Sequence, residues 1–257
     1  MIKEATEMAL NEARDGRAAL SKVKPVLVGK SALAPASAYL RNFAGCILNR
    51  HIDVYDDAIL LLNNERYQAA CMVGRAMIET YAFAGYFYGK LNKLLCSEDC
   101  HSATEDALDL ILKFTNSSRY KVGEQERLSK GVFSLDDYSF TAQAIERMSM
   151  GLAGSEHVMN ALRELYKAEK KHLSSVESPT ELTYDILSEW VHPSQTSLFH
   201  HYVEETHDIP TSVGNVKFFD NAILQCATAI RFIAGAGDHY RWAMELADEM
   251  DRRARNN

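Results

Sequence analysis

The amino-acid sequence lacks an apolar segment for export near its start, where its first 16 residues are MIKEATEMALNEARDG. It also lacks an excess of basic residues, because 28 lysines and arginines are outnumbered by 35 aspartates and glutamates. The net charge of −7 disfavours broad electrostatic binding to DNA, which is typical of basic proteins. We find no internal repeat and no strand hairpin, so a repeat architecture and a sheet protein are both disfavoured.

The cysteine pattern is also sparse, since the sequence has five cysteines and no paired Cys-x-x-Cys motifs. An odd number of cysteines, three of them in apolar helical patterns, indicates reduced thiols in a cytoplasmic protein. Cys96 and Cys100 have no second pair to complete a zinc site. We therefore expect no structural metal and no cofactor. The cysteines are Cys46, Cys71, Cys96, Cys100 and Cys226.

The most informative stretch that is present runs from Tyr67 to Leu91 and reads YQAACMVGRAMIETYAFAGYFYGKL. Apolar residues lie on every side of the helix that this stretch would form. Such a helix either occupies the centre of a bundle or crosses a membrane. Arg75 and Glu79 lie near its middle, where charges would be costly in lipid. We therefore predict a buried central helix and no membrane partner.

The neighbouring segments indicate the fold class. Residues 38–62 show apolar residues at three- and four-residue steps, which predicts a long amphipathic helix. The short turn at Asn63-Asn64 makes that helix an antiparallel neighbour of the central one. The sequence thus predicts an all-α protein, a helical bundle around one long buried helix at about 67–91. We expect a single domain over residues 1–257, with 1–24 as a peripheral helix that spans residues 2–22.

Helix start signals mark the second half of the chain. Residues 102–105 and 178–181 each match a capping box, the latter with Pro179 at the first helical position. The helix that begins at 179 should end near His192, because a residue before proline disfavours helical geometry. Further helices are predicted over 139–150 and 156–174. A histidine-rich loop is predicted over 194–213, and one long helix is predicted from about residue 215 to the end.

Two groups of polar residues are candidates for a functional site. Arg75 and Glu79 are four residues apart, so they lie on one helix face within pairing distance. Tyr184, Ser188 and His192 share one face of helix 179–192 by the same spacing. A pocket that joins the groups would have Arg75, Glu79 and His192 as catalytic candidates, with the two hydroxyl groups in support. The alternative is structural, with the hydroxyl groups only satisfying a buried charge pair.

Four segments of the sequence carry a resemblance to a group of bacterial all-helical proteins of unassigned function, over about residues 40–200. They are Leu60-Leu-Leu, Tyr67-x-Ala-Ala, Arg75-x-x-x-Glu79-Thr80 and Tyr184-x-x-Leu187-Ser188-x-x-x-His192-Pro193. More distantly, the chain resembles the HEPN class (higher eukaryotes and prokaryotes nucleotide-binding). Proteins of that class are helical bundles, often dimeric and common in toxin and phage-defence systems, and many cleave RNA.

The working motif of the HEPN class is an arginine followed, after four to six residues, by a histidine, and this sequence lacks it. Arg231 and His239 have seven residues between them, whereas Arg50 and His51 are adjacent. An arginine and a histidine from separate helices, such as Arg75 and His192, would have to replace the motif. The departure leaves open whether the protein is an enzyme.

Metal binding is a further alternative, because the sequence holds Glu-x-x-His pairs at 98–101, 169–172 and 204–207, a spacing typical of di-iron helical bundles. Such a site needs two of these pairs and two more glutamates, all on buried helices. The pair at 169–172 lies in a lysine-rich run, and the pair at 98–101 lies in a predicted loop. The third, at 204–207, belongs to the histidine-rich stretch 200–208, which keeps metal binding open there.

These observations favour two functions. The resemblance implies a HEPN-like protein that binds RNA or cleaves it without a metal, in a toxin or phage-defence setting. Its partners would be RNA, an antitoxin or defence protein, and a second copy in a homodimer. The acidic charge and the missing motif favour the alternative, a non-catalytic dimerising adaptor or a sensor that takes a small anion at Arg75.

Overall fold

The computed structural model describes residues 2–24, 35–96, 103–115, 156–194, 197–198 and 216–256. The described residues form helices and no strand, so the prediction of an all-α fold is confirmed. The helices are α1 (Ile2–Ala18), α2 (Ala36–Asn63), α3 (Tyr67–Leu95), α4 (Ala103–Thr115), α7 (Val158–Leu173), α8 (Pro179–Val191), α10 (Val216–Ile230) and α11 (Ile233–Asn256).

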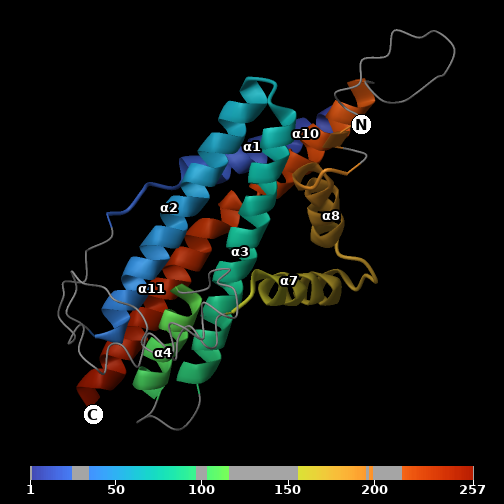
Figure 1. Cartoon of the computed structure of the whole chain (residues 1–257). Helices are drawn as coiled ribbons and strands as arrows, with labels where there is room; N and C mark the ends of the chain where they lie inside the picture. The colour runs from blue at the N-terminus through green and yellow to red at the C-terminus, as the bar shows by residue number, and fades with distance from the viewer. Residues whose placement is uncertain are drawn as a thin grey trace, which may run out of the picture.

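Three long helices, α2, α3 and α11, lie side by side and form the body of the bundle (Figure 1). The chain reverses between α2 and α3 at residues 64–66, where Glu65 adopts a left-handed φ of 56°. The backbone N–H groups of Asn64 and Arg66 donate to carbonyl groups in the last turn of α2. These bonds satisfy the helix end and fix the antiparallel hairpin that the sequence predicts.

Helix α3 is the central helix, and it extends four residues beyond the predicted end at Leu91. It packs against α2, α4, α7, α8, α10 and α11, which explains why its residues are apolar on every side. Gly74 and Gly85 allow close approach: a Cβ at either position would lie 3.3 Å from a side-chain atom of Cys226 or His239.

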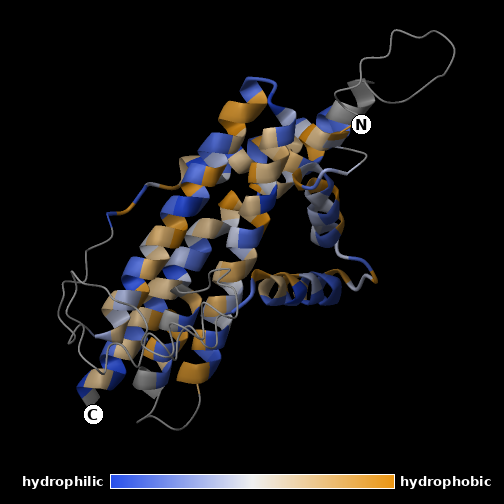
Figure 2. Cartoon of the chain, in the orientation of Figure 1, coloured by the Kyte–Doolittle hydropathy of each residue, from blue (hydrophilic) through white to orange (hydrophobic). Residues whose placement is uncertain are grey.

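The core has two parts along α3. The first core cluster joins α3 to α1, α2, α7, α8, α10 and the start of α11, and it includes Met77, Ile78 and Trp190. The second core cluster joins the carboxyl half of α3 to α2, α4 and α11, and it includes Phe87 and Phe114. In Figure 2, hydrophobic and hydrophilic residues alternate along the helices, as is usual for helices that bury one face.

The predicted long C-terminal helix is interrupted, which corrects the expectation of one continuous helix. Residues 231–232 form turns between α10 and α11, and the N–H groups of Phe232 and Gly235 donate to carbonyls three residues earlier. A Cβ on Gly235 would lie 2.8 Å from the Tyr81 hydroxyl, so glycine is needed where the break meets α3. The break lets α10 pack on α1 and α8 while α11 packs on α2.

Helix α1 ends at Ala18, four residues earlier than predicted. Residues 20–24 have no regular structure, and the side chain of Asn49 on α2 bonds both backbone groups of Val23. Arg17 also donates from its side chain to the Leu20 carbonyl at 3.0 Å. Side chains of this kind satisfy backbone groups that a longer helix would otherwise pair internally. The helix itself packs against α10 and α11.

Several predictions fall on residues outside the described ranges: the helix over 139–150, most of the loop over 194–213, and Ser102 and Cys100. Within the described ranges, no helix combines the length and apolar character needed to span a membrane. The arrangement in Figure 1 places α7 and α8 beside α3, away from α2 and α11, and these two short helices carry the residues that meet the central charge pair.

Candidate functional site

The predicted charge pair forms on α3. Arg75 donates from Nε to Glu79 Oε1 at 3.0 Å, one helical turn away. The side chains remain 15% and 26% exposed, respectively, so the pair is partly buried. This corrects the expectation of a fully buried pair, because α7 and α8 cover only part of this face. Partial exposure lowers the cost of desolvating the two charges.

Tyr184 on α8 joins the pair. Its hydroxyl donates to Glu79 Oε1 at 2.9 Å, so this one carboxylate oxygen accepts from both α3 and α8. The guanidinium carbon of Arg75 lies 4.8 Å from the centre of the Tyr184 ring, a cation–π distance. Burial, followed by the negative charge of Glu79, raises the pKa of Tyr184 to about 12. The hydroxyl is therefore protonated near neutral pH and acts as a donor.

Two polar atoms of this cluster are enclosed and have no hydrogen-bond partner among the described residues. They are Nη1 of Arg75 and the hydroxyl of Tyr166 on α7. The Tyr166 ring centre lies 6.4 Å from that of Tyr184, and Tyr166 is only 8% exposed. Burial raises the pKa of Tyr166, so this hydroxyl also keeps its proton. In the sequence, Tyr166 is one of several apolar residues within the predicted helix 156–174, and no spacing signal links it to Arg75.

The remaining predicted residues of the Tyr-Ser-His segment do not join this cluster. Ser188 donates to the backbone carbonyl of Tyr184 at 2.7 Å, which turns its hydroxyl back to its own helix. His192 caps α8 through its backbone N–H, and its side chain is exposed. His192 follows Tyr184 by eight residues, which corresponds to about 12 Å along a helix axis. The structure thus brings together Arg75, Glu79 and Tyr184.

Helix α8 is held in place by a glutamate from α7. Ser178 accepts from the N–H of Glu181 at 3.0 Å, so the predicted serine cap is confirmed. In the predicted capping box, Glu181 would accept from the backbone N–H of Ser178. The structure corrects this role, because the Glu181 carboxylate pairs with Lys170 at 2.7 Å. Glu169 instead accepts from the Ser178 hydroxyl and from the N–H and hydroxyl of Thr180. These bonds fasten the start of α8 to α7 and thereby position Tyr184.

The metal candidates find little support in the part of the chain that the structure describes. Glu169 is committed to capping α8, and His172 is exposed. Within the described ranges, no group of three or more histidine, cysteine, aspartate or glutamate side chains is arranged to hold a metal ion. The pairs at 98–101 and 204–207 and the stretch 200–208 lie outside the described residues.

Two cysteines are buried where α3 crosses α10. Cys226 donates to the Ala70 carbonyl at 3.2 Å, and Cys71 donates to the Ala222 carbonyl at 3.6 Å. Burial raises the pKa of the Cys71 thiol to about 12 and also raises that of Cys226. A thiol that keeps its proton is a poor nucleophile, so these cysteines act as small packing residues.

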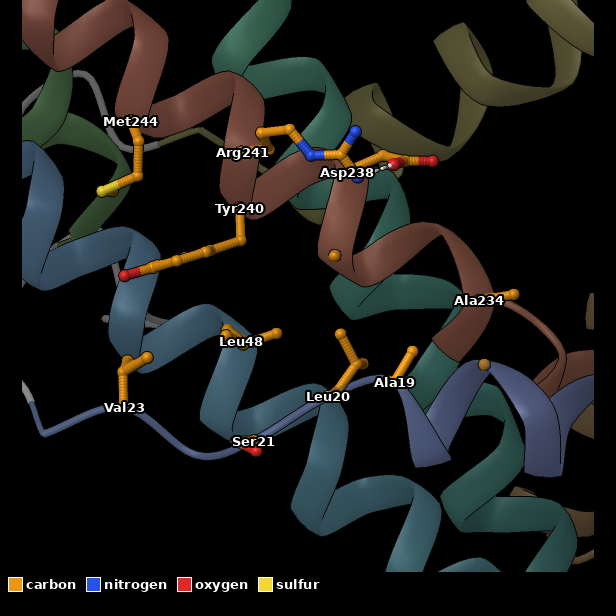
Figure 3. A pocket seen from close by; sticks show the side chains of 12 residues that line it. Ala19, Leu20, Ser21, Val23, Leu48, Ala234, Asp238, Tyr240, Arg241 and Met244 are labelled. Carbon is orange, nitrogen blue, oxygen red and sulfur yellow. Dashed lines mark hydrogen bonds and ion pairs between the residues drawn. The ribbon is translucent and has the colours of Figure 1, made fainter.

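A groove of about 470 Å³ opens on another side of the bundle, between residues 19–23, α2 and α11 (Figure 3). Its lining is mainly apolar, with Leu20, Leu48 and Met244 prominent. Asp238 and Arg241 lie at its edge and pair with each other at 2.6 Å. The volume lies in the usual range for a small-molecule site, but the two charges at the edge neutralise each other.

Comparison with known proteins identifies no relative: no family model, no curated protein and no solved structure matches the chain.

Proposed function

We propose that this protein is a non-catalytic binding protein that takes an anionic group of its ligand at Arg75. The observation that carries the proposal is the enclosed Nη1 of Arg75, which has no partner among the described residues although Nε is bonded to Glu79. Leaving a buried charged donor unpaired is costly, and a ligand oxygen would remove that cost. A guanidinium group also binds carboxylate and phosphate oxygens with two parallel bonds.

The surroundings of Arg75 suit such a role. The Tyr166 hydroxyl is a second enclosed donor in the same cluster, and the protonated Tyr184 holds Glu79 from the other side. Glu79 stays 26% exposed, so the cluster has an edge that faces solvent. An incoming anion would share the guanidinium group with Glu79, and the negative charge of Glu79 would keep the affinity for that anion moderate.

RNA cleavage is the rival proposal, and the resemblance to the HEPN class supports it. It requires His192 and Arg75 to act on one phosphodiester. An acid–base group works within about 3 Å of the proton that it transfers, whereas His192 lies about 12 Å along α8 from the tyrosine that meets Glu79. The exposed ring of His192 is available for proton transfer, but this spacing favours binding over cleavage. An antitoxin partner and a homodimer remain predictions of the resemblance.

Binding would be tested with the full-length protein by calorimetry and thermal shift, with phosphate, sulfate, a dicarboxylate and a nucleoside monophosphate as separate probes. We expect saturable binding of at least one anion to wild type. Arg75→Gln should abolish that binding, and Arg75→Lys should weaken it, because lysine keeps the charge but loses the planar fork. Arg241→Gln is a matched control, since Arg241 is 70% exposed and also pairs within its own helix.

Equal binding by Arg75→Gln and Arg241→Gln would overturn the proposed site, as would no binding of any of these anions to folded wild type. The catalytic alternative is tested by incubating the protein with total RNA and by expressing it in bacteria. Cleavage of RNA that is lost in His192→Ala, with the melting temperature unchanged, would replace the binding proposal by the ribonuclease proposal.

A further inference from the structure

Three enclosed polar atoms lie between α2, α3 and α11, away from the Arg75 cluster. They are Nε2 of His51, the hydroxyl of Tyr88 and Nδ1 of His239, and none has a hydrogen-bond partner among the described residues. His51 and Tyr88 are 0% exposed. We call these three side chains the polar layer. Buried polar atoms are almost always paired in folded proteins, so three together point to a bound molecule.

The three side chains converge from different helices. The contacts Arg50–Thr80 and Phe43–Phe87 set the antiparallel register of α2 and α3. Side chains on a helix lean toward its N-terminus, so His51 leans toward Ile47 on α2 while Tyr88 leans toward residues 84–85 on α3. Because α2 and α3 are antiparallel, the His51 and Tyr88 side chains lean toward each other and end at about the same height along the bundle.

His239 lies at that level. Its ring is 3.3 Å from where a Cβ on Gly85 would stand, and its ring centre is 6.0 Å from that of Tyr88. The same ring stacks on Tyr81 at 4.3 Å, and Tyr81 also contacts His51 edge-on at 6.3 Å. The polar layer is therefore continuous through these rings and lies where the first core cluster gives way to the second.

The hydrogen-bonding roles follow from the contacts. Nδ1 of His51 is 2.9 Å from the Ile47 carbonyl, so Nδ1 carries the proton and Nε2 presents a lone pair. The Tyr88 hydroxyl both donates and accepts. Both imidazoles are neutral, because burial lowers the pKa of each to about 4.

The positive charge of a cation would not be neutralised in this layer. Its three facing atoms are neutral, and Asp238, next to His239 in the chain, is 73% exposed and paired with Arg241. A metal ion would enter the core without a compensating charge, which is unfavourable. A neutral molecule with both donor and acceptor capacity fits the layer instead.

We propose that the polar layer binds an ordered water molecule that bridges at least two of its three enclosed atoms. The water donates to His51 Nε2 and exchanges hydrogen bonds with the Tyr88 hydroxyl or His239 Nδ1. Internal waters of this kind make about three hydrogen bonds to buried polar groups and are costly to remove. The bridge would tie α2, α3 and α11 together at the junction of the two core clusters.

The variant Tyr88→Phe distinguishes a polar layer that holds water from a dry one, since it removes the hydroxyl and keeps the ring. If the hydroxyl bonds to water, its loss should lower the melting temperature of the full-length protein by about 2–4 °C. If the hydroxyl is unpaired in a dry core, removing it should raise the melting temperature. The variant Tyr39→Phe is the control, because Tyr39 is half-buried at the rim of the second core cluster and should show no change.

A high-resolution crystal structure of the wild type supplies the direct test. We expect a water oxygen within about 3.2 Å of two of the three atoms. A dry layer, or a raised melting temperature for Tyr88→Phe, would overturn the proposal. A stoichiometric metal ion in the purified protein that is lost in His51→Gln would overturn it as well, in favour of a metal site.

Discussion

The stability of this protein should fall steeply in mild acid, because two histidines are held neutral inside the bundle. Burial lowers the pKa of His51 to about 4, and the nearby His239 and Arg50 add to the effect. Burial also lowers the pKa of His239 to about 4, against a small opposing effect of Asp238. The ordinary histidine pKa is 6.5, so the unfolded chain binds more protons than the folded chain below that value.

The sign and size of the effect follow from this difference. Each depressed pKa contributes stability that is fully present above pH 6.5 and is lost as the pH falls toward 4. A histidine pKa lowered from 6.5 to about 4 corresponds to about 3 kcal/mol for each of the two residues. Two histidines would thus cost up to about 6 kcal/mol, a large part of the 5–15 kcal/mol that is usual for a whole domain. The slope near pH 5 should approach about 2.7 kcal/mol per pH unit.

The assay is urea unfolding of the full-length protein, followed by far-UV circular dichroism at steps between pH 7.5 and pH 4.5. The interval from 6.5 to 5 is the most informative, because the carboxylates with lowered pKa values, such as Glu249, titrate below it. His51→Leu should remove about half of the slope, whereas the exposed His172→Leu should leave it unchanged. A free energy of unfolding that stays flat from pH 6.5 to 5 would refute the argument, as would an unchanged slope in His51→Leu.

Three further predictions concern packing and polar contacts, each measured by chemical denaturation. Glu79→Ala should destabilise the protein by about 2–3 kcal/mol, less than for a fully buried pair, because Arg75 and Tyr184 lose their shared acceptor; a change below 0.5 kcal/mol would mean that solvent replaces the carboxylate. Glu169→Ala should cost about 1–2 kcal/mol by freeing the start of α8, while the exposed Glu177→Ala should cost little. Gly16→Ala should cost at least about 1–3 kcal/mol, because the new Cβ would lie 2.6 Å from the Ala234 backbone, and near-wild-type stability would show that α1 can shift away.

Much of the local architecture could be predicted because it depends on neighbours in the chain. The all-round apolar pattern of 67–91 identified the central helix, and the two-asparagine turn identified its antiparallel neighbour. Ser178 and Pro179 marked the start of α8, and the four-residue spacing of Arg75 and Glu79 predicted their contact. In each case a helical repeat of 3.6 residues converts sequence spacing directly into geometry.

The tertiary structure alone decided what lies opposite each helix face. The same four-residue spacing suggested that Tyr184, Ser188 and His192 act together, yet only Tyr184 reaches Glu79, because α8 meets α3 along part of its length. Glu169 caps α8 because the chain after α7 brings the start of α8 against the Glu169 side chain. Tyr166 meets Tyr184 from a different helix, and the polar layer brings Tyr88 next to His239, about 150 positions later in the sequence. Such convergence depends on how all the helices pack at once, and spacing within one segment carries no record of it.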